Sequence, residues 1–154
     1  MGIEIERKFL VTTTTWKNNV TGSQSYRQGY LNRDPNRTVR IRLAEPKAWI
    51  TVKSSTDGLR RHEYEYEIPF ADGEEMLAIC EIPIIEKVRH LSEVGGLVWE
   101  IDEFLGDNVG LIVAEVELES EEQAFEKPPW AGEEVTHDVR YYNSHLSQNP
   151  FSAW

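Results

Sequence analysis

The sequence predicts a mainly β fold of the α+β class, in which eight strands form a largely antiparallel sheet. Apolar and polar residues alternate with a period of two through most of the chain, as they do along half-buried strands. Short turn signals separate these segments, and connections this short join antiparallel neighbours. A sheet of eight strands can remove its exposed edges by closing into a barrel.

The expected strands follow one another closely along the chain. Clusters of Asp, Asn, Gly, Glu and Pro mark the turns between them, at 34–36, 45–47, 57–58, 95–96 and 106–108. The strands themselves are expected near residues 2–11, 25–32, 37–44, 48–54, 60–68, 83–91, 97–104 and 111–119.

Helices are expected to be few and short. Asp72 is the expected N-cap of a helix that runs to Cys80, with Glu75 completing a capping box. Ser120 and Gln123 repeat that signature, and Pro128-Pro129 then breaks the chain before its tail. Two further short helical segments are expected, at 14–19 and 141–147.

Length and composition indicate one globular domain over residues 1–154. The net charge of −11 argues against a general nucleic-acid or membrane binder, although a locally basic pocket for a polyanion is compatible with it. Cys80 is the only cysteine, so no intrachain disulfide is possible. The N-terminus has no apolar signal core and no apolar run approaches a membrane span, so a cytoplasmic location is expected.

Nearly every expected strand has one charged face, and the sign of the charge is sorted by strand. A sheet with one solvated face explains this pattern, and so does a barrel with its charges inside. The alternation by itself leaves the two interpretations open. The basic positions are Arg40, Arg42, Lys53, Lys87 and Arg89, and the acidic positions are Glu100, Asp102, Glu115 and Glu117.

The first strand contains the most informative motif, Glu4-Ile5-Glu6-Arg7-Lys8. Because side chains alternate along a strand, Glu4, Glu6 and Lys8 share one face. Two carboxylates beside an ammonium are suited to holding a metal ion and a phosphate together.

These motifs resemble the CYTH family, the triphosphate tunnel metalloenzymes, whose signature near the N-terminus is Glu-x-Glu-x-Lys. The resemblance covers almost the whole chain and is closest to the short bacterial members. Further matching segments follow in the expected order: Tyr26-Arg27-Gln28-Gly29-Tyr30-Leu31, Arg40-Ile41-Arg42, Thr51-Val52-Lys53, Glu63-Tyr64-Glu65, Glu86-Lys87-Val88-Arg89, Glu100-Ile101-Asp102, Glu115-Val116-Glu117, 130–136 and Arg140-Tyr141-Tyr142-Asn143.

The resemblance implies a closed eight-stranded antiparallel barrel around a tunnel, with the charged faces inward and short helices outside. It also implies Mg²⁺- or Mn²⁺-dependent chemistry on a triphosphate. The carboxylates would repel phosphate unless cations intervene, so their presence favours metal ions. The implied metal ligands are Glu4, Glu6, Asp102, Glu115 and Glu117, with Glu63 and Glu65 either ligating metal or orienting the basic side chains.

The substrate-binding set implied by the resemblance consists of six basic residues. Arg offers a planar fork to phosphate oxygens and Lys a point charge. Glu4, Glu6, Lys8 and Tyr30 are the expected catalytic residues, Tyr30 as a possible proton acceptor, although a packed sheet tyrosine is an equal alternative. The triphosphate-binding residues are Lys8, Arg40, Arg42, Lys53, Lys87 and Arg89.

The expected reaction is hydrolysis of inorganic tripolyphosphate to pyrophosphate and phosphate. A short chain leaves little material for a base or ring pocket, which favours a small polyanion as the substrate. The alternatives are a nucleotide or thiamine triphosphate enzyme, including a class IV adenylyl cyclase, and a non-catalytic polyphosphate-binding module. A plain structural barrel with solvated charges is the third interpretation.

Overall fold

A computed structural model of the chain describes residues 2–54 and 59–154. All eight expected strands are present, and a ninth, β9, was not predicted. The expected turn at 57–58 lies outside the described residues. The strands are β1 (Gly2–Val11), β2 (Gly22–Asn32), β3 (Thr38–Ala44), β4 (Lys47–Ser54), β5 (Arg60–Ile68), β6 (Glu81–Val94), β7 (Leu97–Phe104), β8 (Ile112–Glu117) and β9 (Ala131–Glu134).

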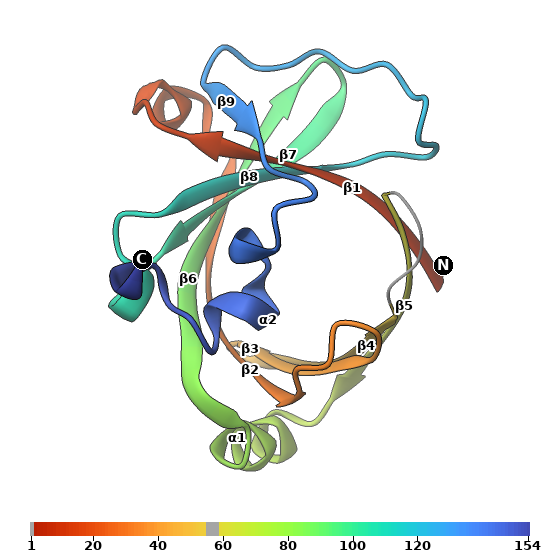
Figure 1. Cartoon of the computed structure of the whole chain (residues 1–154), viewed down its shortest axis with the longest axis vertical. Coiled ribbons are helices and arrows are strands. Elements are labelled where there is room, and N and C mark those ends of the chain that lie inside the picture. Colours follow the sequence, from red (N-terminus) through yellow and green to blue (C-terminus); the bar gives the residue numbers. More distant parts are fainter. Residues whose placement is uncertain (1, 55–58) are drawn as a thin grey trace.

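The sheet closes on itself, so the predicted eight-stranded antiparallel barrel is confirmed (Figure 1). Its strands follow the order β5-β4-β3-β2-β6-β7-β8-β1, and β5 also pairs with β1. Two registers close the ring on either side of β1: Glu4 lies opposite Arg61 of β5, and Lys8 lies opposite Glu115 of β8. β9 pairs with the last residues of β1 and stands outside the ring of eight.

The helical segments are short, as expected, but the predicted start of the first helix and the helix predicted after Ser120 are wrong. Helix α1 (Phe70–Ala78) begins before Asp72, with Pro69 at its N-cap and no side-chain capping bond. The capping box does not form because Asp72 already lies within the first turn. The other segments are η1 (Thr15–Asn19), η2 (Gly106–Asn108), η3 (Val139–Tyr141), α2 (Asn143–Leu146) and η4 (Phe151–Ala153). Within the described residues, no helix has the length and apolar character needed to cross a membrane.

The helix expected after Ser120 is also absent from the structure, where a single turn is followed by extended chain. The side chain of Gln123 accepts a hydrogen bond from the backbone N–H of Glu119, which lies outside the expected capping box. The extended chain lets Phe125 pack against the rings of Phe9 and Trp99. Tertiary packing therefore overrides the local helix signal at this position.

The outer surface of the barrel supplies two apolar cores. One lies beneath the 118–131 segment and η1, where outward side chains of β1, β7 and β8 pack with Trp16 and Trp130. The other lies beneath α1, where Leu77 and Cys80 cover Ile41 and Leu43 of β3. These cores leave the opposite face of the same strands free to be polar, because alternate side chains of a strand point to opposite sides of the sheet.

One end of the barrel interior is apolar. Ile85, Phe104 and Val113 share the inward faces of their strands with charged residues, yet they pack against Tyr141 and Leu146. Helix α2 therefore lies within the outline of the barrel in Figure 1. This placement differs from the expectation that the short helices all pack outside, which α1 does fulfil.

Gly73 sets how closely α1 approaches the sheet. A Cβ at this position would lie 2.5 Å from Cβ of Ala48 and 2.8 Å from Cδ2 of Leu43. Gly73→Ala is therefore expected to destabilise the protein by about 1–3 kcal/mol through overpacking, despite the better helix propensity of alanine. Urea denaturation measures the change, with the exposed Glu74→Ala as the matched control. A variant more stable than the native protein would contradict this account of α1 packing.

Candidate active site

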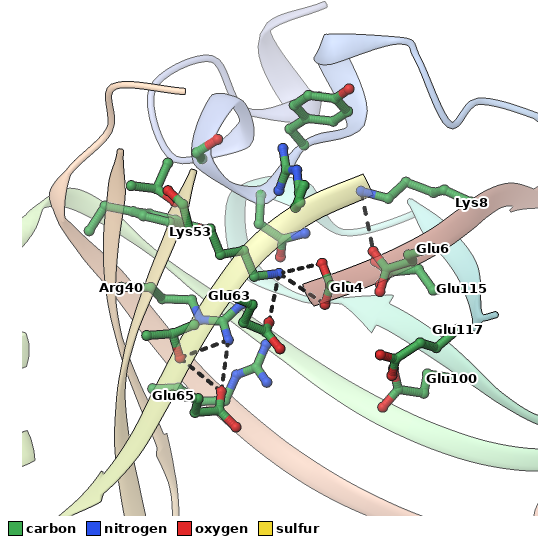
Figure 2. A pocket seen from close by; sticks show the side chains of 18 of the residues that line it. Glu4, Glu6, Lys8, Arg40, Lys53, Glu63, Glu65, Glu100, Glu115 and Glu117 are labelled. Carbon is green, nitrogen blue, oxygen red and sulfur yellow. Dashed lines mark hydrogen bonds and ion pairs between the residues drawn. The ribbon is translucent and has the colours of Figure 1, made fainter. Parts of the chain in front are cut away.

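A cavity of about 380 Å³ lies in the barrel interior and is lined by charged side chains of both signs (Figure 2). Glu4, Glu6 and Lys8 of β1 face it together, as the alternation of the first strand predicted. The charged faces therefore point inward, and the interpretation that left them in bulk solvent is wrong. The predicted residues that line this cavity are Glu4, Glu6, Lys8, Tyr30, Arg40, Arg42, Lys53, Glu63, Glu65, Lys87, Arg89, Glu115 and Glu117.

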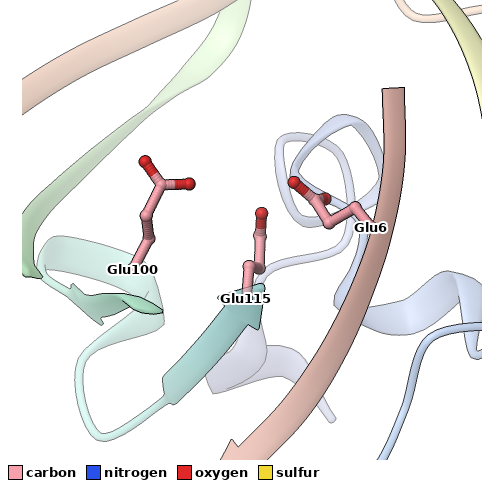
Figure 3. Close-up of side chains that lie close together, drawn as sticks. All are labelled: Glu6, Glu100 and Glu115. Carbon is pink, nitrogen blue, oxygen red and sulfur yellow. The ribbon is translucent and has the colours of Figure 1, made fainter. Parts of the chain in front are cut away.

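Three carboxylates meet at one wall of the cavity. Glu6, Glu100 and Glu115 come from three adjacent strands, and each offers an oxygen within 4.8 Å of those of the other two (Figure 3). Burial, followed by repulsion from Glu115 and Glu4, raises the pKa of Glu6 well above its ordinary value. All three side chains offer carboxylate oxygens, the ligand type that hard divalent cations prefer, so the cluster is a candidate cation site.

Glu100 is a member of this cluster that the sequence analysis did not place among the metal ligands. Glu100 and Asp102 share the inward face of β7, so alternation gives no reason to choose between them. The β7–β8 register distinguishes the two residues, because Glu100 lies directly opposite Glu115 of β8 whereas Asp102 lies opposite Val113. A long-range register of this kind cannot be read from the pattern of one strand.

Asp102 lies behind the cavity wall and does not line the cavity. One carboxylate oxygen accepts a hydrogen bond from Lys87 Nζ at 2.7 Å, and Arg89 donates to both oxygens at 2.8 and 3.0 Å. Burial raises the pKa of Asp102, but Arg89 and Lys87 hold this pKa far below its ordinary value. The geometry thus favours Asp102 as the counter-charge of two basic residues over the predicted role of metal ligand.

Lys87 is the most deeply buried of the basic residues, with 1% of its surface exposed. Burial lowers its pKa to about 7 against the opposing effect of Asp102, and Arg89 and Arg42 lower it further. Its ammonium also donates to Asn143 Oδ1 at 3.0 Å. Asn143, at the start of α2, therefore brings the C-terminal segment into the basic wall of the site.

The acidic residues of β1 and β5 hold the basic residues of β3 and β4. Lys53 Nζ lies 3.2 Å from Glu4 and 3.3 Å from Glu63. Arg40 lies 3.4 Å from Glu65 (Figure 2). Burial raises the pKa of Glu4, but the Lys53 ammonium lowers this pKa below its ordinary value. Glu63 and Glu65 therefore orient basic side chains, which was one of the two roles expected for them.

The C-terminal segment also contacts Lys8. Lys8 Nζ lies 3.7 Å from Glu115, donates to the backbone oxygen of Tyr141 at 3.3 Å, and lies 5.2 Å from the ring centroid of Tyr142. Burial raises the pKa of Glu115, but Lys8, with a smaller contribution from Arg89, lowers this pKa overall to about 2. Tyr142 and Asn143 were part of a matching motif, but no pattern in the sequence assigned them a contact within the site.

Three further predicted residues, Glu117, Tyr30 and Arg42, also line the cavity. Glu117 lies opposite Glu6 in the β1–β8 register, and burial followed by Glu4 and Glu63 raises its pKa. Tyr30 is 5% exposed and lines the cavity. Its role as a proton acceptor stays a prediction. Arg42 lines the cavity as well, and its Nε donates to Gln28 Oε1 at 2.9 Å.

The fold and the site together define a class of protein: a closed antiparallel β barrel with an acidic wall and a basic wall around its interior cavity. Comparison with known proteins gives the family. Residues 2–145 match the CYTH domain, and the chain belongs to this family.

Its relatives cover nearly the full chain. An inorganic triphosphatase of Acetivibrio thermocellus is 48% identical over 152 residues, which are 98% of this chain and 97% of that protein. An inorganic triphosphatase of Nitrosomonas europaea is 40% identical over 149 residues, covering 94% and 96%. The crystal structure of the inorganic triphosphatase NE1496 superposes with a TM-score of 0.65 at 38% identity, covering 94% of this chain and 93% of that one.

The position of Asp102 predicts a large effect on stability. Asp102→Asn leaves the charges of Lys87 and Arg89 without their shared buried partner, so the free energy of unfolding is expected to fall by about 3 kcal/mol or more. Urea denaturation measures it, and Glu93→Gln, an exposed change on the same β6–β7 hairpin, is the control. If Asp102→Asn unfolds at the native urea midpoint, the carboxylate is not the counter-charge inferred here.

Proposed function

We propose that this protein hydrolyses inorganic tripolyphosphate to pyrophosphate and phosphate with the help of divalent metal ions. The observation that carries the proposal is that carboxylates and basic side chains face the same cavity inside the barrel. Basic residues alone would suffice for a protein that only binds polyphosphate. The inward carboxylates oppose such a ligand unless cations lie between them, which favours the metal-assisted enzyme. The two inorganic triphosphatase relatives support the same substrate.

The residues present fit Mg²⁺ or Mn²⁺. Both ions prefer oxygen ligands, and the cluster of Glu6, Glu100 and Glu115 provides carboxylate oxygens only. Burial, followed by the carboxylates of Glu115 and Glu4, raises the pKa of Glu6, and a bound cation would favour the ionised form of this carboxyl. We propose that this cluster holds the metal, with Glu4 and Glu117 beside it. A bound divalent ion supplies positive charge to phosphate oxygens and polarises water.

The basic side chains bind and orient the substrate in this proposal. Arg40, Arg42, Lys53, Lys87 and Arg89 approach the cavity from three strands, so they can hold successive phosphates of a short chain. Lys8 stands between the carboxylate cluster and the C-terminal segment. Hydrolysis requires water to attack the terminal phosphorus in line with the departing pyrophosphate, and positioning plus electrostatic stabilisation supply most of the catalysis.

A substrate panel tests the proposed reaction. Phosphate release is expected to be fastest from tripolyphosphate, and at least about tenfold slower from ATP and thiamine triphosphate, because a cavity lined mostly by charged and polar side chains offers little apolar surface to a base or ring. The assay compares kcat/KM for the three substrates at one Mg²⁺ concentration. Release from ATP or thiamine triphosphate far above that from tripolyphosphate would instead indicate a nucleotide or thiamine enzyme.

Metal removal and charge removal test the role of the carboxylates. Chelator is expected to abolish activity, and added Mg²⁺ or Mn²⁺ is expected to restore it. Glu6→Gln is expected to lower kcat by about 100-fold or more while tripolyphosphate still binds, since the basic walls remain. Glu93→Gln, which lies outside the cavity, serves as the charge-matched control. Full turnover in metal-free buffer would falsify the metal-assisted reaction.

A further inference from the structure

Arg42 differs from the other five basic residues of the predicted substrate-binding set. Each of the others lies within 4.0 Å of a carboxylate, as in the pairs Lys8–Glu115 and Lys53–Glu4. Among the described residues, no such ion pair includes Arg42, although it lines the cavity and is buried. A buried guanidinium without a carboxylate needs other groups to hold it.

Two uncharged side chains of β2 hold Arg42. Gln28, fully buried, accepts a hydrogen bond from Arg42 Nε at 2.9 Å. Its amide nitrogen in turn donates to Asn143 Oδ1 at 3.0 Å, which fixes the orientation of the amide. The ring of Tyr26 supplies the second contact, with its centroid 4.5 Å from Cζ of Arg42.

The Tyr26 ring also faces a second guanidinium, since its centroid lies 5.2 Å from Cζ of Arg89. Two like charges on one ring repel each other, and burial followed by repulsion from Arg40 and Arg89 lowers the pKa of Arg42 to about 10. Arg42 is still charged at neutral pH. An aromatic face attracts a cation without cancelling its charge, unlike a carboxylate. Arg42 therefore keeps a full positive charge at the cavity.

We propose that Tyr26 is a positioning residue: with Gln28 it forms an uncharged cradle that holds Arg42 ready for a phosphate of the substrate. The inference rests on the proposed triphosphate hydrolysis. An arginine that is paired with a carboxylate must share its hydrogen bonds between that partner and an incoming phosphate. Arg42 has no carboxylate to give up, so its charge is available to the substrate without rearrangement.

The test compares Tyr26→Leu with Tyr26→Phe. Removing the ring is expected to raise KM for tripolyphosphate about tenfold, a change of about 1.4 kcal/mol that lies within the range of cation–π contacts, while kcat changes less than about threefold. Tyr26→Phe keeps the aromatic face and should behave like the native enzyme. Tyr66→Leu removes an exposed tyrosine from the outside of β5 and is the matched control. Tyr26→Met replaces Tyr26→Leu should the latter not fold.

A second measurement is independent of turnover. The Nε–Hε resonance of Arg42, assigned with Arg42→Lys, is expected to lose its ring-current shift in Tyr26→Leu and to keep it in Tyr66→Leu. Calorimetry with tripolyphosphate should show a Kd about tenfold weaker for Tyr26→Leu. If the native protein binds but does not hydrolyse tripolyphosphate, the proposed function fails while these two readouts still test the cradle. The cradle proposal is overturned if Tyr26→Leu leaves the Arg42 resonance unchanged, or if its KM and Kd stay within twofold of the native values.

Discussion

Asp102 forms buried ion pairs with Lys87 and Arg89 inside the barrel, where little water reaches. Ion pairs of this kind organise the whole interior. Charges removed from water are costly unless opposite charges and hydrogen bonds compensate them. Asp102 of β7 lies opposite Arg89 of β6, and Glu63 of β5 lies opposite Lys53 of β4. Adjacent strands of opposite sign therefore satisfy most of the buried charge before any ligand arrives.

The same requirement accounts for the outer layers. A strand that turns its charged side chains inward must turn its apolar side chains outward, and those need cover. Helix α1 covers β3, and the extended 118–131 segment with η1 covers β1, β7 and β8. The segment after Ser120 stays extended for this reason, since a compact helix would not carry Phe125 onto Phe9 and Trp99. The barrel thus has its main apolar cores on the outside.

Local alternation was enough to predict the eight strands, the antiparallel sheet and the set of charged positions, because these depend on the side-chain period of each strand. The direction in which the charged faces point depended on a family resemblance. What local patterns missed depends on contacts between distant residues. β9 is too short to show a period, the choice of Glu100 over Asp102 follows from the β7–β8 register, and the contacts of Asn143 and Tyr142 arise from the docking of the C-terminal segment.

The pairing of β1 has a consequence for how the chain folds during synthesis. β1 is made before every strand that it pairs with, since its partners Arg61, Glu115 and Ala131 all lie much later in the sequence. The edge of β1 that faces β5 must wait for residues 60–63, and the edge that faces β8 must wait for residues 113–117. Closing such distant pairs is slow. The Glu-x-Glu-x-Lys segment therefore lacks its β8 partner until residues 113–117 have been made, and the charged cavity can close only after that strand has formed.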